Sequence, residues 1–218
     1  MFVYPRFNVF GWFNFVHLNF WYFIGKTFLP QLTWRRETTE KVVYLTFDDG
    51  PHPRITPWVI GELNKVGAKG TFFVVGENAA KYSTTISLLS TNRHKIGNHT
   101  HRHVKGWNMS ASEYLAEIGQ CESVIGNQDL FRPPFGRINF KAIPQIKEDK
   151  EVIMWDGLTK DYLKKLNLER AQKRIQKATR PGSIVVFHDS EKAEKNLKAL
   201  LPEYLHYLKT EGYEMRAL

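Results

Sequence analysis

The stretch VVYLTFDDGP, residues 42–51, decides how this chain folds. Its first six residues are apolar, aromatic or β-branched, which is typical of a strand buried on both faces of a parallel sheet. The run ends in two adjacent carboxylates, Asp48 and Asp49, and a Gly-Pro turn follows at once. Because active sites of parallel α/β folds lie beyond the carboxyl ends of the strands, this ending predicts a polar site there.

Strand patterns recur along the chain and alternate with helical patterns. The expected strands cover residues 42–47, 71–75, 96–98, 130–132, 152–155, 183–187 and 213–217. The expected helices cover residues 56–66, 77–94, 110–125, 140–148, 168–178 and 194–210. Such alternation predicts an α/β fold with parallel strands and right-handed crossovers. Seven strands favour a closed or nearly closed barrel, with a doubly wound open sheet as the alternative.

Polar side chains follow the later strands as well. After the third to sixth expected strands the chain carries, in order, His99 and His103, Arg132, Asp156 and Asp161, and His188 and Asp189. Parallel strands bring their carboxyl ends to one rim, so we expect a single site built from these residues. Asp189 is interpreted as a support for the site.

Two histidines and one acid of this set form a candidate metal site. His99 and His103 are four residues apart, so both could face one way on a helical turn. Two imidazoles and a carboxylate suit Zn²⁺ or another divalent ion with a bound water. Successive side chains at a strand end point in different directions, so one of Asp48 and Asp49 should bind the metal while the other takes a proton from water. Taken alone, the histidine pair and the Asp-Gly-Pro turn also have purely structural interpretations.

The first 40 residues form an aromatic-rich segment ahead of the main domain at residues 41–218. Residues 7–25 carry no formal charge, although three asparagines and a histidine lower their hydropathy. This composition is poor for a spanning helix, and it favours an element at a membrane surface, through residues 1–30, or across the bottom of the barrel. No alanine precedes Ala68, so a cleavable signal peptide is not indicated, and we expect a cytoplasmic or membrane-associated protein.

Composition limits the remaining function classes. The net charge is +9, but the basic residues are scattered, which indicates a solvated basic surface and no nucleic-acid partner. The one cysteine, Cys121, allows neither an internal disulfide nor a thiolate metal cluster. The oligomeric state is not predicted.

Five motifs occur together in one order: TFDDGP (46–51), HTHRH (99–103), RPPFG (132–136), WDGLTKDY (155–162) and VFHD (186–189). With them the chain resembles the polysaccharide deacetylases with NodB homology, carbohydrate esterase family 4, from about Lys41 onward, and in detail the small stand-alone bacterial members. The resemblance implies a single-domain, distorted (β/α)₇ barrel. It also implies a metal-dependent hydrolase that removes N-acetyl groups from N-acetylglucosamine-containing poly- or oligosaccharides, such as peptidoglycan or chitooligosaccharides, and releases acetate.

The resemblance assigns roles to the matched positions. It implies a divalent metal, Zn²⁺ foremost with Co²⁺ as an alternative, bound by Asp49, His99 and His103. The implied proton-transfer and supporting groups are Asp48 as general base, Arg132 holding that carboxylate, the Phe135 backbone N–H as oxyanion donor, His188 as general acid, and Asp161 behind His188. The implied substrate-binding positions are Pro133, Pro134, Tyr162 and Val186.

Three positions depart from the family pattern. Phe135 stands where the family usually has Tyr, Tyr162 where it has Trp, and Val186 where it has Leu. The last two changes bear on the acetyl pocket and therefore on substrate range. A metal-dependent amidohydrolase or an O-acetyl esterase acting on another substrate is the alternative, and a non-catalytic carbohydrate-binding protein would lack ligands that this chain retains.

Overall fold

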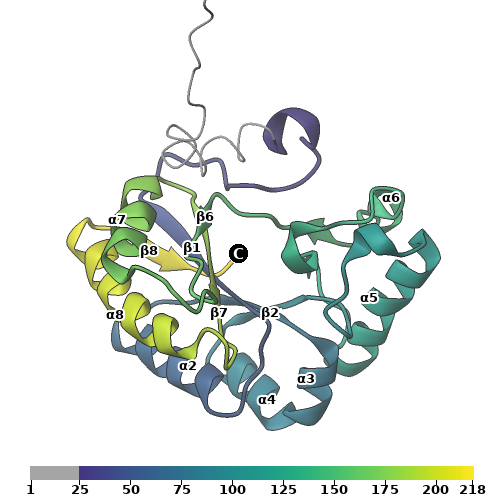
Figure 1. The fold of residues 1–218 in the computed structure, drawn as a ribbon, viewed down its shortest axis with the longest axis horizontal. Coiled ribbons are helices and arrows are strands. Elements are labelled where there is room, and N and C mark those ends of the chain that lie inside the picture. The colour runs from purple at the N-terminus through teal and green to yellow at the C-terminus, as the bar shows by residue number, and fades with distance from the viewer. Residues whose placement is uncertain (1–24) are drawn as a thin grey trace, which may run out of the picture.

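The computed structural model describes residues 25–218, and its framework is a curled sheet of parallel strands surrounded by helices (Figure 1). The strand order is β5-β4-β3-β2-β1-β7-β6, and β8 pairs with β1 beside β2. The strands are β1 (Val42–Asp48), β2 (Thr71–Val74), β3 (Lys95–Asn98), β4 (Leu130–Phe131), β5 (Glu151–Val152), β6 (Gly157–Leu158), β7 (Ile184–His188) and β8 (Glu214–Arg216). The expected α/β class with parallel pairing is confirmed, while the short strand β6 was not expected.

The helices lie around the outside of the sheet, with α7 and α8 at the left and α5 and α6 at the right of Figure 1. They are α2 (Ile55–Lys65), α3 (Gly76–Lys81), α4 (Ser83–Thr91), α5 (Ala111–Ile125), α6 (Ile143–Ile146), α7 (Leu168–Ala178) and α8 (Glu194–Thr210), with 3₁₀ turns η1 (Gly106–Asn108) and η2 (Pro134–Gly136). The predictions for α7 and α8 match these bounds. The capping box of Ser110 and Glu113 sets the start of α5.

Two helix predictions were wrong in extent. The helix expected over residues 77–94 is two helices, because Tyr82 has non-helical angles, φ −125° and ψ 49°, between α3 and α4. The helix expected over residues 140–148 shrinks to α6, where Pro144 occupies the first turn. Proline lacks an N–H and clashes with the preceding turn, so it fits the start of a helix and not its interior.

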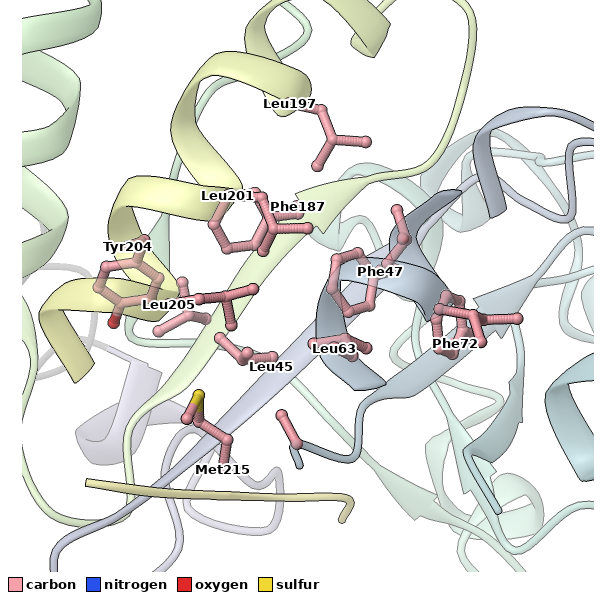
Figure 2. Packing of buried hydrophobic residues seen from close by; sticks show 14 of the residues in the cluster. Leu45, Phe47, Leu63, Phe72, Phe187, Leu197, Leu201, Tyr204, Leu205 and Met215 are labelled. Carbon is pink, nitrogen blue, oxygen red and sulfur yellow. The ribbon is translucent and has the colours of Figure 1, made fainter. Parts of the chain in front are cut away.

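Alternate residues of the strands face the helices and form the larger core (Figure 2). Phe47 stacks on Phe72 of β2 at 4.8 Å between ring centroids and on Phe187 of β7 at 5.9 Å. Helix α8 covers these rings with Leu201 and Leu205, which belong to the same buried cluster. Burying a side chain of this size contributes about 1.5–3 kcal/mol, so this outer layer fixes the strands against the helices.

The other strand face points into the curl of the sheet and ends in the polar residues. Because side chains alternate along a strand, Thr46 and Asp48 face opposite to Phe47. The register pairs Thr46 with Val186 and Asp48 with His188 on neighbouring strands. Two polar residues at the ends of adjacent strands therefore stand side by side at the carboxyl rim of the sheet.

Strands β5 and β6 are not paired with each other, and a segment ahead of β1 bridges the opening. Thr33 forms a bridge with Ile153, and Arg35 forms one with Ser183. The Thr33 N–H donates to the Val152 carbonyl at 2.9 Å, and the Arg36 N–H donates to the Gly182 carbonyl at 3.0 Å. Residues 33–36 thus close the curled sheet. The predictions that concern residues 1–24, a membrane-surface or barrel-bottom element, lie outside the described residues. Within residues 25–218, no helix has both the length and the apolar composition that a membrane crossing needs.

Removing the Arg35 side chain, which lies in the segment of residues 33–36, should destabilise the fold. The Arg35 guanidinium contacts the buried Asp156 carboxylate at 2.6 Å, and Asp156 also accepts from the Ser183 hydroxyl and the Ile184 N–H. We expect Arg35→Ala to lower the free energy of unfolding by about 3 kcal/mol in urea titrations, because it leaves a buried carboxylate without its partner. Lys173→Ala, which breaks an exposed helical pair, is the control. Equal stability of Arg35→Ala and the control would contradict this account.

Candidate active site

The two acids at the end of β1 diverge because the backbone turns between them. Asp48 is the last residue of the strand, and Asp49 has φ 76°, in the left-handed region that a non-glycine residue seldom adopts. The Asn78 side chain holds this turn by donating to the Asp49 carbonyl at 2.8 Å. Strained residues of this kind concentrate at functional sites, where surrounding contacts maintain them.

Asp49 faces the two histidines of the HTHRH motif. Its Oδ1 lies 3.0 Å from Nε2 of His103 and 3.8 Å from Nε2 of His99. One ligand atom from each of the three residues falls within a cluster 4.8 Å across. His99 Nδ1 lies 2.7 Å from the Arg132 carbonyl, to which it donates when its proton sits on that nitrogen, so its Nε2 lone pair faces the cluster. The sequence-predicted metal residues therefore do come together.

The electrostatics at His99 and Asp49 favour the protonation states that a metal needs. Burial lowers the pKa of His99 to about 4, which keeps this imidazole neutral. Burial alone would raise the pKa of Asp49, but the hydrogen bond from His103 and the nearby imidazoles hold it well below its usual value. A carboxylate and neutral imidazoles are the forms that coordinate Zn²⁺.

The local geometry of the histidines differs from the prediction. His99 and His103 lie in a loop and not on a helical turn, so the reasoning from helical spacing was wrong. They converge because Thr100 and His103 both have left-handed backbone angles, with φ 64° and 56°. The loop is fixed by hydrogen bonds from the Thr100 N–H to the Asn98 side chain and from the Val104 N–H to the Thr100 hydroxyl.

Asp48 is held by a buried arginine and not by the histidines. Arg132 is fully buried, and its Nη1 donates to Asp48 Oδ1 and to the Thr46 hydroxyl, both at 2.7 Å. The rest of the guanidinium donates to the carbonyls of Ile153 and Met154. Each nitrogen of the Arg132 guanidinium thus has at least one hydrogen-bond partner, as a buried cation requires. The Asp48 carboxylate is held by Arg132 and not by the triad. The role of Thr46 was missed, although its spacing two residues before Asp48 on one strand face signals it.

His188 and Asp161 form the second buried pair of the rim. His188 Nδ1 lies 2.7 Å from Asp161 Oδ1, and the His188 backbone N–H donates to Asp161 Oδ2 at 2.8 Å. Burial opposes a charge on His188, but the Asp161 carboxylate outweighs it and raises the pKa of His188 to about 9. The imidazole is therefore protonated at neutral pH, and its Nε2 side is left for a reacting group.

Asp189 lies behind the site and supports it, in agreement with its interpretation from the sequence. Its carboxylate accepts from the Gly50 N–H at 3.2 Å and from the Thr56 hydroxyl, and its own N–H donates to the Asp48 carbonyl at 3.1 Å. The carboxylate packs so closely on Gly50 that any side chain at this position would clash with it. Asp189 therefore ties the turn after β1 to the end of β7.

The remaining sequence-predicted residues surround the two pairs and the triad. Phe135 has a left-handed backbone angle, φ 59°, and is 56% exposed. Its ring centre lies 4.6 Å from that of His103. Pro133 and Pro134, which precede it, are buried. The Tyr162 ring meets the His188 ring edge-on at 4.9 Å. Val186 is buried on the inner strand face, two residues before His188. All of these positions belong to one rim.

A curled parallel sheet whose rim carries a candidate metal-binding triad beside an arginine-held acid and a carboxylate-held histidine is the arrangement of a hydrolase of the polysaccharide deacetylase class. The chain belongs to the polysaccharide deacetylase family, whose family model matches residues 35–150. A peptidoglycan-N-acetylglucosamine deacetylase of Bacillus cereus is 31% identical over 189 residues, covering 84% of this chain and 88% of that protein. A chitooligosaccharide deacetylase of Azorhizobium caulinodans is 30% identical over 154 residues, covering 67% and 73%.

Solved structures show the same fold. A crystal structure of a peptidoglycan N-acetylglucosamine deacetylase superposes with a TM-score of 0.80 at 26% identity, covering 86% of this chain and 91% of that one. The peptidoglycan deacetylase PdaC of Bacillus subtilis superposes with a TM-score of 0.74 at 28% identity, covering 84% and 90%. The expected (β/α)₇ barrel fold is thereby confirmed.

Proposed function

We propose that this protein is a metal-dependent deacetylase that removes N-acetyl groups from N-acetylglucosamine-containing glycans, including peptidoglycan, and releases acetate. One observation carries the proposal: the two acids of the TFDDGP motif have separate partners. Asp49 lies with His99 and His103, whereas Asp48 is held by Arg132. This division lets one carboxylate bind the metal while the other accepts a proton, the two functions that metal-assisted hydrolysis of an amide uses. The names of the relatives support the substrate class.

The triad fits a borderline divalent ion, and we propose Zn²⁺. Its donors are one carboxylate oxygen and two imidazole nitrogens, a set with open positions that suits Zn²⁺ in catalytic sites. The contact of His99 Nδ1 with the Arg132 carbonyl directs the other ring nitrogen toward the site. When bound there, such an ion supplies Lewis acidity toward the substrate carbonyl and an attacking water.

The residues of the chain carry the proton transfers. Asp48 accepts the proton of the attacking water, and its contact with the Arg132 guanidinium holds the carboxylate in position for this task. The Phe135 N–H donates to the carbonyl oxygen as negative charge develops on it, and one such donor is worth about 3–4 kcal/mol. His188, protonated against Asp161, gives its proton to the departing sugar nitrogen, because an amine leaves poorly without one.

Acetate release from a substrate panel tests this proposal. We expect acetate from peptidoglycan and chitooligosaccharides, loss of that activity with a chelator, and recovery on adding Zn²⁺. Co²⁺ restoration would be compatible with the same donor set. If only acetylxylan, an O-acetyl ester, released acetate, the enzyme would be an esterase and the amide specificity proposed here would be wrong.

The pH dependence should report on His188. Because its pKa is raised to about 9, its proton-bearing form exists below that value and is lost as pH rises through it. We therefore expect kcat to fall on the basic side, at or somewhat below pH 9, since a bound cation offsets the attraction of Asp49. Asp161→Asn removes the carboxylate that raises the pKa, so its basic limb should move to lower pH. If the basic limb of the pH profile stayed in place in Asp161→Asn, that limb would belong to a group other than His188.

A further inference from the structure

An exposed group of aromatic and basic side chains adjoins the metal triad and has no part in the chemistry above. We call Lys105, Trp107, Phe135 and Arg137 the rim ledge. The Phe135 ring contacts His103, which places one end of the ledge against the triad. Trp107 is 58% exposed and Phe135 56% exposed. Large aromatic rings left this open beside the candidate catalytic rim offer apolar surface to a ligand.

Two separate loops form the rim ledge, and hydrogen bonds hold them together. The Gly106 N–H donates to the Arg137 carbonyl at 2.9 Å, and the Asn139 side chain donates to the carbonyls of Gly106 and Met109. The loops approach so closely that a Cβ on Gly106 would lie 2.6 Å from the Asn139 nitrogen. The backbone contacts therefore hold Lys105, Trp107 and Arg137 in fixed relation to the site.

Each cation of the rim ledge rests on one of its rings. Lys105 Nζ lies 5.1 Å from the centre of the Phe135 ring, and the Arg137 guanidinium lies 5.0 Å from that of Trp107. Such contacts restrain long basic side chains while leaving their charge exposed. Within residues 25–218, Lys105 and Arg137 take part in no ion pair, so their charge is available to a ligand.

We propose that the rim ledge binds the sugar next to the one being deacetylated and selects glycans in which that sugar carries a carboxylate. This inference rests on the proposed function and, within its substrate class, places glycans that carry a carboxylate above neutral ones. The rings offer apolar surface to the C–H face of a pyranose, and a guanidinium matches a carboxylate with two parallel hydrogen bonds. A neutral glycan could use the rings but would leave both cations without an anionic partner.

The test compares two tetrasaccharides, chitotetraose and a peptide-free glycan of alternating N-acetylglucosamine and N-acetylmuramic acid. We expect the ratio of kcat/KM for the acidic over the neutral glycan to fall about five- to tenfold in Lys105→Gln/Arg137→Gln, as for two partly exposed charge pairs. Added salt should lower the same ratio in the unmodified protein. The control Arg93→Gln/Lys209→Gln removes one arginine and one lysine near the opposite end of the strands, and its ratio should not change.

Binding separates this inference from the proposed function. In an Asp48→Asn background, calorimetry should show weaker binding of the acidic glycan when the two cations of the rim ledge are replaced, whether or not the glycan is a substrate. The rim ledge would not select a carboxylate if replacing its two cations left both the kcat/KM ratio and the affinity for the acidic glycan unchanged. An equal loss of kcat/KM for the acidic and the neutral glycan would also contradict the proposal. Failure of the unmodified protein to release acetate from either glycan would instead overturn the proposed function.

Discussion

Replacing Asp48 with Asn is expected to lower kcat for acetate release by about 10²–10⁴-fold, the range typical for loss of a general base, while leaving the bound metal in place. The Asp48 carboxylate contacts Arg132, which also donates to Thr46. The candidate metal-binding atoms belong to Asp49, His99 and His103, so replacing Asp48 removes none of them. The measurement pairs initial rates with the metal content of dialysed protein. Circular dichroism checks that the variant is folded.

His103→Ala is the matched comparison. It removes one of the three atoms that cluster around the candidate metal position, so we expect both metal content and activity to be lost. The pair of variants separates the two functions of the TFDDGP motif. Metal lost in Asp48→Asn but kept in Asp49→Asn would reverse the assignment of the two acids.

Replacing Arg132 with Met should produce the largest loss of stability of the variants considered, about 3–5 kcal/mol, because breaking one side of a buried ion pair leaves an uncompensated charge. Arg132 is fully buried and donates to four acceptors on two chain segments, namely Asp48 and Thr46 on one and the carbonyls of Ile153 and Met154 on the other. Urea unfolding monitored by fluorescence measures the change.

A double-mutant cycle distinguishes the charge pair from general packing. Asp48→Asn in the Arg132→Met background should restore part of the lost stability, since no buried carboxylate then remains at this position. Arg132→Lys tests the fork geometry, because a lysine keeps the charge but cannot reach several fixed acceptors at once. If Arg132→Met were as stable as the unmodified protein, the guanidinium would not be the element that holds the rim together.

The sequence went far in predicting this protein because its signals are local. Side-chain chemistry over short stretches predicted the strand before Asp48 and Asp49 and the helices over residues 168–178 and 194–210. The five motifs in their order carried the resemblance to the family. The alternation of strand and helix patterns then led to the parallel sheet, and the rule that parallel strands meet at one rim gathered the polar residues into one site.

What the sequence could not provide depends on long-range contacts and on backbone angles. The bridge of residues 33–36 forms because the backbone at the end of β5 and just before β7 has groups that need hydrogen-bond partners. The histidine loop converges through left-handed angles at Thr100 and His103, which cost energy locally and persist because Asn98 and neighbouring groups hold them. The rim ledge likewise joins loops about thirty residues apart through Gly106 and Arg137. Tertiary structure decided these features, because each is a conformation that no short stretch of the chain would adopt alone.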